Sequence, residues 1–231
     1  MATILVTGAT RGLGRETARR LAAGGHDVYL GARDLDRGKE VAEEIGCDAV
    51  QLDVDDDGSV ARALAAVGER AGRLDVLINN AGVSGPYKPV DEVTADEMQA
   101  VFNTNVFGVV RVMQNSLPLL ELSDNPVVVN VSSGLGSIGL GLAPTSFEFT
   151  VPGLAYHSSK TALNMVTVQY AKTHPNMRIN AVDPGFTATD MTHHQGTQTI
   201  EEGIEVILRL AQIGQSGPTG GFFHARGPVP W

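Results

Sequence analysis

Short apolar runs alternate with longer helical patterns along this 231-residue chain, and that alternation restricts the possible folds more than any other feature. Runs rich in Val, Ile and Leu lie at 3–7, 27–32, 49–52, 76–79, 127–131, 178–182 and, with a weaker pattern, 221–224. Helical patterns lie at 12–23, 35–45, 59–71, 95–120, 156–173 and 200–212. Because the strand runs are almost wholly apolar, we expect both faces of their sheet to be covered. The order predicts an α/β fold, a doubly wound parallel sheet of about seven strands with helices on both faces.

Length and composition predict one soluble domain spanning 1–231, since two full domains would need a longer chain. The formal net charge of −9 argues against nucleic acid or an anionic membrane as a general partner. Cys47 is the only cysteine, so no internal disulfide can form and a reducing compartment is favoured. The start of the chain lacks a signal-peptide pattern, and no apolar stretch is long enough to span a membrane. We therefore expect a cytoplasmic protein.

A glycine-rich turn, Gly8-Ala9-Thr10-Arg11-Gly12-Leu13-Gly14, follows the first predicted strand and opens the first predicted helix. Glycine is needed where a backbone turns with positive φ, or where a phosphate approaches the main chain closely. The free N–H groups and the dipole of a helix start stabilise negative charge. This turn is a candidate phosphate-binding site, although a tight turn that binds nothing would have the same residues.

Two long segments, 134–153 and 187–198, have no regular pattern. Both follow predicted strands, and ligands of open α/β sheets bind at the carboxyl ends of the strands. Loops of this length in a compact domain are usually binding loops or lids. We expect them to form the substrate loops of the domain.

With Thr7 in front, the turn has the spacing Thr-Gly-x-x-x-Gly-x-Gly, which resembles the short-chain dehydrogenase/reductase family and its Rossmann-like fold. The resemblance continues in the family's order through Asp53, Asn79-Asn80-Ala81-Gly82, Asn105, Ser132-Ser133, Tyr156-x-x-x-Lys160 and Asp183-Pro184-Gly185. Each motif is short, but the ordered set is specific and spans positions 7 to 189.

The resemblance implies a nicotinamide cofactor bound along the carboxyl edge of the sheet. Asp53 is expected at the adenine, Asn80 beside the cofactor strand, and Thr189, with Thr187 as the alternative, at the nicotinamide carboxamide and diphosphate. The cofactor contacts it implies are Gly8, Thr10, Arg11, Gly12, Leu13, Gly14, Arg33, Asp53, Val54, Asn80, Ala81, Gly82, Tyr156, Lys160, Pro184, Gly185, Thr187 and Thr189.

The end of the second strand carries opposing signals about which nicotinamide cofactor binds. Asp34 lies at about the spacing of the acid that holds the ribose 2′-hydroxyl of NAD. Arg33 could instead grip a 2′-phosphate bidentately, with Arg11 reaching the same group, although Arg33 could also be a solvated surface residue. By resemblance, Ala32 occupies the position where NAD-preferring relatives carry the acidic residue that binds the ribose. Asp34 is then better interpreted as the N-cap of the next helix. We expect NADP(H) rather than NAD(H).

Tyr156 and Lys160 are four residues apart on a predicted helix, so their side chains share one face. A neighbouring ammonium is expected to lower the pKa of the tyrosine toward the range useful for proton exchange. The resemblance makes Tyr156 the proton donor, Lys160 a ligand of the nicotinamide ribose, and Ser133 the hydroxyl that polarises a substrate carbonyl. It makes Asn105 the holder of a water in the proton path. Ser132 is the alternative to Ser133 for the first of these roles, and Asn103 is the alternative to Asn105 for the second.

These residues predict an NADP(H)-dependent oxidoreductase that transfers hydride between nicotinamide and a carbonyl or alcohol substrate. The alternative is a non-catalytic NADP-binding sensor on the same fold, and an epimerase or dehydratase is a weaker third hypothesis. No metal site is expected, since Asp55, Asp56 and Asp57 suit a helix start and His193 and His194 are adjacent. The 22 residues between Ser133 and Tyr156 favour a monomer or a dimer over the tetramer usual in the family.

Overall fold

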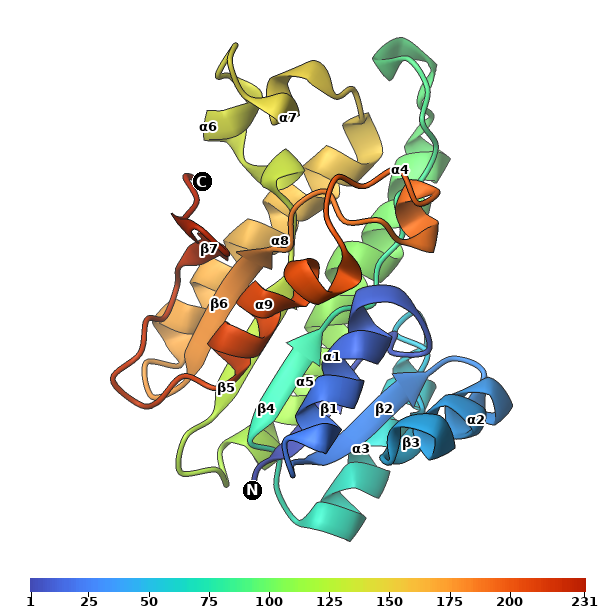
Figure 1. The fold of residues 1–231 in the computed structure, drawn as a ribbon, viewed down its shortest axis with the longest axis vertical. Coiled ribbons are helices and arrows are strands. Elements are labelled where there is room, and N and C mark those ends of the chain that lie inside the picture. The colour runs from blue at the N-terminus through green and yellow to red at the C-terminus, as the bar shows by residue number, and fades with distance from the viewer.

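The computed structural model describes all residues 1–231 and is built around one eight-stranded sheet with the order β3-β2-β1-β4-β5-β6-β7-β8 (Figure 1). The strands are β1 (Thr3–Val6), β2 (Asp27–Ala32), β3 (Asp48–Gln51), β4 (Val76–Asn79), β5 (Val127–Val131), β6 (Arg178–Asp183), β7 (Phe222–His224) and β8 (Gly227–Pro228). All neighbouring strands are parallel except β8, which pairs antiparallel with β7. The order reverses between β1 and β4, which is where open α/β sheets bind ligands.

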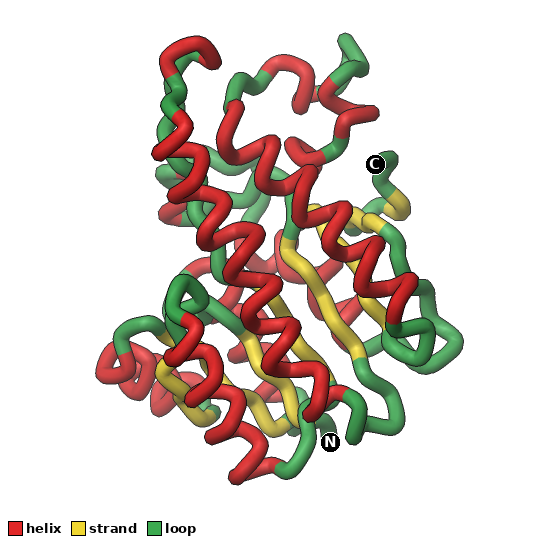
Figure 2. The backbone as a smooth tube through the Cα atoms, turned by 180° about the vertical axis from the view of Figure 1, so that it is seen from behind, coloured by secondary structure: helices red, strands yellow, loops and turns green.

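Helices cover both faces of the sheet (Figures 1 and 2). One face is packed by α1 (Gly12–Ala23), α2 (Leu35–Ile45) and α9 (Ile200–Ala211), and the other by α3 (Asp57–Ala71), α5 (Val109–Leu120) and α8 (Leu154–Thr173). The remaining helical segments are α4 (Ala95–Phe102), the π segment η2 (Asn103–Gly108), α6 (Ile138–Gly141), α7 (Phe147–Thr150) and the 3-10 turns η1 (Val90–Glu92), η3 (Gly134–Gly136) and η4 (Asp190–Thr192). No helix is long and apolar enough to cross a membrane.

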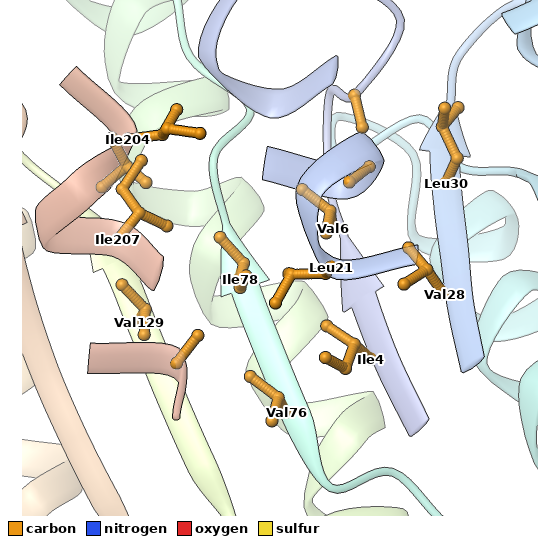
Figure 3. Packing of buried hydrophobic residues seen from close by; sticks show 14 of the residues in the cluster. Ile4, Val6, Leu21, Val28, Leu30, Val76, Ile78, Val129, Ile204 and Ile207 are labelled. Atoms are coloured by element: carbon orange, nitrogen blue, oxygen red, sulfur yellow. The ribbon is translucent and has the colours of Figure 1, made fainter. Parts of the chain in front are cut away.

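The two faces hold separate apolar cores because successive side chains of a strand point to opposite sides. Ile4 and Val6 of β1 pack with Leu21 of α1 and Ile207 of α9 (Figure 3). Leu5, between them, belongs to the core on the other face. Burial on both faces explains why the central strands are mostly apolar at successive positions and do not alternate with polar residues.

The predicted doubly wound α/β fold is confirmed, and most predicted elements agree with the structure to within two residues. The sheet has eight strands rather than about seven, because the two residues of β8 add an edge strand to β7. A Gly-Pro pair has no strand pattern of its own, and the pairing depends on a tertiary contact. Gly139 donates its N–H to the Trp231 carbonyl at 2.9 Å, and the Trp231 ring stacks on Phe222, so the last residues lie against the body of the protein.

The segment 95–120 is helical throughout, as its pattern predicts, but it is not a uniform α-helix. The chain forms α4, then the π segment η2, then α5, with no break in its helical direction. The apolar pattern continues across the π segment, so periodicity alone could not reveal it. In the tertiary structure, the helix passes very close to the segment after β3 at this point, since a Cβ at Gly108 would lie 3.0 Å from the Val54 side chain. Short π segments inside helices are frequent at functional sites.

Candidate active site

A cavity of about 1190 Å³ lies at the carboxyl ends of the strands, and residues of α7 and η4 line it. Every cofactor-binding or catalytic residue predicted from the sequence lines this cavity except Asn105. Both irregular loops contribute to its wall, the first through Gly134, Leu135, Phe147, Glu148 and Val151, and the second from Thr187 to Gln195. The fold therefore gathers residues from positions 8 to 195 around one space.

The glycine turn connects β1 to α1 and leaves the start of that helix free. Side chains cap the starts of α2, α3, α4 and α9, but Arg11 at the start of α1 makes no side-chain capping bond. The first N–H groups of α1 therefore lack a side-chain partner and lie at the cavity, together with the positive end of the helix dipole. This arrangement suits the diphosphate of a dinucleotide.

Two glycines of the turn have no room for a side chain. Gly8 has φ +62°, and a Cβ there would lie 2.8 Å from the Ala81 Cα. A Cβ on Gly14 would lie 2.7 Å from the Gly8 carbonyl oxygen and would run into the Asn80 side-chain amide. The turn is thus packed directly against the end of β4, which fixes the backbone surface that a phosphate would meet.

Thr7 and Asn80 hold that contact together with hydrogen bonds. The Thr7 hydroxyl accepts the N–H groups of Asn80 and Ala81, each at 3.0 Å. The Asn80 amide donates in turn to the carbonyls of Thr7 and Gly8, at 2.9 and 3.0 Å. The predicted place of Asn80 beside the cofactor strand is matched by these bonds.

Arg33 and Asp34, which gave opposing signals about the cofactor, occupy different surroundings. Asp34 accepts the Arg37 N–H at 3.1 Å and caps α2, and it does not line the cavity. Arg33 is exposed, lines the cavity, and forms no ion pair within the chain. Arg11 also lines the cavity and pairs with Asp190 of the second loop at 3.3 Å. This end of the cavity therefore presents guanidinium groups and no free carboxylate from β2.

The acidic residues after β3 are engaged with the chain itself. Asp53 lines the cavity and accepts the Asp55 N–H at 3.0 Å. Asp56 caps α3 by accepting the Ser59 N–H. Asp57 pairs with Arg111 at 2.7 Å. The interpretation of Asp56 as a helix cap is confirmed.

Tyr156 and Lys160 share one face of α8, as their spacing predicted, and both line the cavity. The Lys160 Nζ lies 5.6 Å from the centre of the Tyr156 ring and donates to the Val131 carbonyl at 2.8 Å. Lys160 is buried, at 4% exposure, and Tyr156 is half-buried. The carbonyl end of β5 thus holds the lysine beneath the tyrosine.

Burial governs the acid–base properties of both groups. Desolvation raises the pKa of Tyr156, the nearby Tyr87 and Asp183 raise it further, and Ser133 alone opposes them by hydrogen bonding. Desolvation lowers the pKa of Lys160 to about 8. The expected lowering of the tyrosine pKa by Lys160 is not found, because burial destabilises the ammonium itself and its Nζ lies over the ring, 5.6 Å from the ring centre.

Ser133 and Ser132 differ in what their hydroxyls contact. The Ser132 hydroxyl is buried and donates to the Asn164 side chain at 2.6 Å, which ties β5 to α8. The Ser133 hydroxyl accepts the Leu135 N–H at 3.2 Å and lies within hydrogen-bonding reach of Tyr156. Only Ser133 therefore presents its donor toward the tyrosine side of the cavity.

Asn105 lies within η2, fully buried behind the cavity. Its side chain accepts the Val83 N–H and donates to the Val83 carbonyl and to the Ser159 hydroxyl, each at 2.9 Å. These three bonds fasten the segment after β4 to α8 near Lys160.

The segment after β6 crosses the cavity close to the glycine turn. Pro184, Gly185, Thr187 and Thr189 all line the cavity. Thr187 is buried and uses its hydroxyl within the loop, accepting from Gln198 at 2.9 Å. Thr189 lies over the turn, 3.7 Å from the position of a Cβ at Gly12. This placement favours Thr189 over Thr187 as the residue nearer a bound diphosphate.

Among the cavity residues to which the sequence gave no role are Tyr87, Glu148 and Asp183. Asp183 ends β6 and accepts the Gly185 N–H at 3.0 Å. Its position at the end of a predicted strand could have marked Asp183 as a cavity residue. The motif Asp183-Pro184-Gly185 was used only as evidence of the family resemblance. Tyr87 and Glu148 lie in segments without periodicity, so only the tertiary structure brings them to the cavity.

A family-wide sequence profile described as short chain dehydrogenase matches residues 2–200, and the chain belongs to this family. The short-chain dehydrogenase anuI of Penicillium roqueforti is 36% identical to it, over 91% of this chain and 88% of that relative. A (+)-neomenthol dehydrogenase of Arabidopsis thaliana is 33% identical, over 96% of this chain and 95% of the relative.

The fold is also similar to solved structures of reductases. The NADPH-bound carbonyl reductase from chicken fatty liver has a TM-score of 0.88 at 27% identity, over 100% of this chain and 99% of the other. Salutaridine reductase from Papaver somniferum has a TM-score of 0.85 at 28% identity, over 97% of this chain and 100% of the other. The protein is an oxidoreductase of the short-chain dehydrogenase family.

Proposed function

We propose that this protein is an NADP(H)-dependent carbonyl reductase, or an alcohol dehydrogenase in the reverse direction, with Tyr156 as its proton donor and acceptor. The observation that carries the proposal is the convergence of Ser133, Tyr156 and Lys160 in the same cavity as the uncapped start of α1. The names of the relatives, which include a carbonyl reductase and a neomenthol dehydrogenase, support a carbonyl or alcohol substrate.

The bound dinucleotide supplies the hydride, and the residues of the chain supply the rest. The Ser133 hydroxyl donates a hydrogen bond to the substrate carbonyl oxygen and stabilises the negative charge that develops there. The Tyr156 hydroxyl gives its proton to the same oxygen. Its raised pKa keeps the hydroxyl protonated at neutral pH, which is the form that a proton donor needs in the reductive direction.

Lys160 has two tasks in this proposal. Its ammonium binds the ribose hydroxyls next to the nicotinamide, and it returns a proton toward Tyr156. A pKa near 8 allows Lys160 to exchange protons close to neutral pH. Asn105 supports this path as a positioning residue, because it fixes the segment around Val83 and the neighbouring turn of α8.

The choice of NADP(H) over NAD(H) depends on Arg33, with Arg11 in support. A guanidinium binds a 2′-phosphate through two parallel hydrogen bonds, and Arg33 lines the cavity with no carboxylate to neutralise it. Asp34, the residue that could have bound a ribose hydroxyl, is occupied at the start of α2.

A panel of ketones and aldehydes, assayed by oxidation of NADPH and of NADH, tests the proposal. We expect turnover with NADPH, and we expect Arg33→Ala to raise the KM for NADPH roughly tenfold or more, since a charged hydrogen bond contributes about 1.5–3 kcal/mol. The KM for NADH should not change. Arg37→Ala is the matched control, because Arg37 is an exposed arginine of α2 that does not line the cavity.

Two results would contradict the proposal. Equal turnover with NADH would refute the cofactor preference. Tight NADPH binding without turnover of any carbonyl compound would instead indicate a non-catalytic NADP-binding sensor.

A further inference from the structure

Glu148 of α7 brings a carboxylate to the substrate side of the cavity. A Cβ at Gly134 would lie 2.6 Å from the Glu148 Oε1 and 3.0 Å from the Asp183 Oδ2, so the two carboxyl groups come close together on the side-chain side of this glycine. Gly134 directly follows Ser133, the residue proposed to contact the substrate carbonyl. Both carboxyl groups line the cavity.

Neither carboxylate is neutralised by an ion pair. The ten ion pairs of the chain include neither Glu148 nor Asp183. Burial and the charge of Glu148 raise the pKa of Asp183, while His224 on the neighbouring strand and two backbone N–H groups oppose this. A cation between the two groups would relieve their repulsion and their desolvation.

The basic groups of the cavity lie elsewhere or are engaged. They are Arg11, Arg33, Lys160 and His193. The two arginines lie at the glycine-turn end, and Lys160 is held by the Val131 carbonyl. His193 belongs to the second loop. A substrate with its own carboxylate or phosphate near the carbonyl would therefore meet Glu148 without a countercharge.

Two aromatic rings line the same cavity as the Glu148 carboxylate. Phe147, which precedes Glu148, packs against Phe186 with their ring centres 5.5 Å apart, and both line the cavity. The face of an aromatic ring attracts a cation, and aromatic residues combined with a carboxylate are a common way to bind an alkylammonium group.

We propose that Glu148, with Phe147 and Phe186, selects carbonyl substrates that carry a cationic amine close to the reacting carbonyl. This assignment rests on the proposed function for the position of the carbonyl, and it names the substrate class of that same site. The carboxylate is the specificity-determining group, and the aromatic pair contacts the alkyl substituents of the ammonium group.

The test uses methyl ketones with a trimethylammonium group and their uncharged tert-butyl isosteres. Because Glu148 packs against the residue after Ser133 and successive Cα atoms are about 3.8 Å apart, spacers of roughly two to four carbons are suitable. Dissociation constants are measured by calorimetry on the NADPH-loaded protein carrying Tyr156→Phe, which blocks turnover, and KM values are measured on the protein with Tyr156 intact.

Glu148→Gln keeps the shape of the side chain and removes its charge. We expect it to weaken binding of the ammonium ketone roughly tenfold and to leave the tert-butyl ketone unchanged. Glu148→Lys should weaken the ammonium ketone further. Glu69→Gln, an exposed and unpaired acid of α3, changes the net charge equally and should have no effect.

Equal effects of Glu148→Gln on the charged and uncharged ketones, or no binding of the ammonium ketones at all, would overturn the assignment. If uncharged ketones are reduced in this case, the proposed function still stands. If the ammonium ketones bind in a Glu148-dependent way but no ketone is reduced, the cation site stands and the reductase function fails.

Discussion

The two ends of the cavity are built differently. At the glycine-turn end, regular elements pack so closely that Gly8 and Gly14 have no space for a methyl group, and Thr7 and Asn80 join the strands by four hydrogen bonds. At the substrate end, the wall is formed by short segments of the two irregular loops, among them η3, α7 and the turn η4, and the neighbouring α6 is, like α7, only four residues long. The large apolar side chains of this region, among them Leu142, Phe147 and Phe149, are exposed.

The difference follows from what each end has to bind. A dinucleotide has an invariant diphosphate, so the surface that meets it can be backbone held in one conformation. A segment with few buried contacts opens at lower free energy and tolerates sequence change. One family can therefore keep its cofactor end and vary its substrate end, and Tyr156 and Lys160 lie where the two ends meet.

The largest effect on activity should come from a substitution of Tyr156, which lies where the two ends of the cavity meet. Tyr156→Phe removes the proton donor and leaves the ring that packs in the cavity. We expect kcat for ketone reduction to fall roughly 10²–10⁴-fold, the usual contribution of a positioned acid. The Kd for NADPH, measured by its fluorescence, should stay within about twofold of the unchanged protein. Near-normal turnover by this variant would end the proposed mechanism.

A pair of glycine substitutions compares the two ends directly. Gly14→Ala places a methyl group against the Gly8 carbonyl and the Asn80 amide, so we expect a loss of about 2–3 kcal/mol in the free energy of unfolding. The Kd for NADPH should rise with it. Gly141→Ala, at the end of α6, has no heavy atom within 4 Å of the new methyl group and should be neutral. Equal losses in the two variants, measured by urea unfolding, would refute the contrast between the ends.

The smallest predicted effect concerns the charge of Lys160. Burial lowers the pKa of Lys160 from 10.5 to about 8, so above pH 8 the unfolded chain binds more protons at this site than the folded one. Stability contributed by this group must therefore rise with pH between 8 and 10.5, by about 2 kcal/mol from pH 7.5 to 9.5. Urea unfolding of the cofactor-free protein and of Lys160→Met should reveal the rise as the difference between their pH profiles. Parallel profiles would show that the lysine keeps its ordinary pKa.

Much of the fold could be predicted because local pattern and tertiary role agree. The strand sequences are mostly apolar since both faces of the sheet are covered, and the glycines mark a turn that excludes side chains. The choice of Ser133 over Ser132 rested on resemblance, and the structure adds a reason, because Ser132 is committed to Asn164. The π segment was missed, since one inserted residue in a helical turn leaves the apolar pattern almost unchanged.

By itself the sequence determined the order of strands and helices, the glycine-rich turn and the spacing of Tyr156 and Lys160, because each depends on residues close together in the chain. Only the tertiary structure decided what surrounds them. It buried Lys160 under β5, reversed the expected shift in the pKa of Tyr156, and set Glu148 opposite Asp183. The physical reason is that desolvation and charge proximity depend on the packing of distant segments, which no local pattern records.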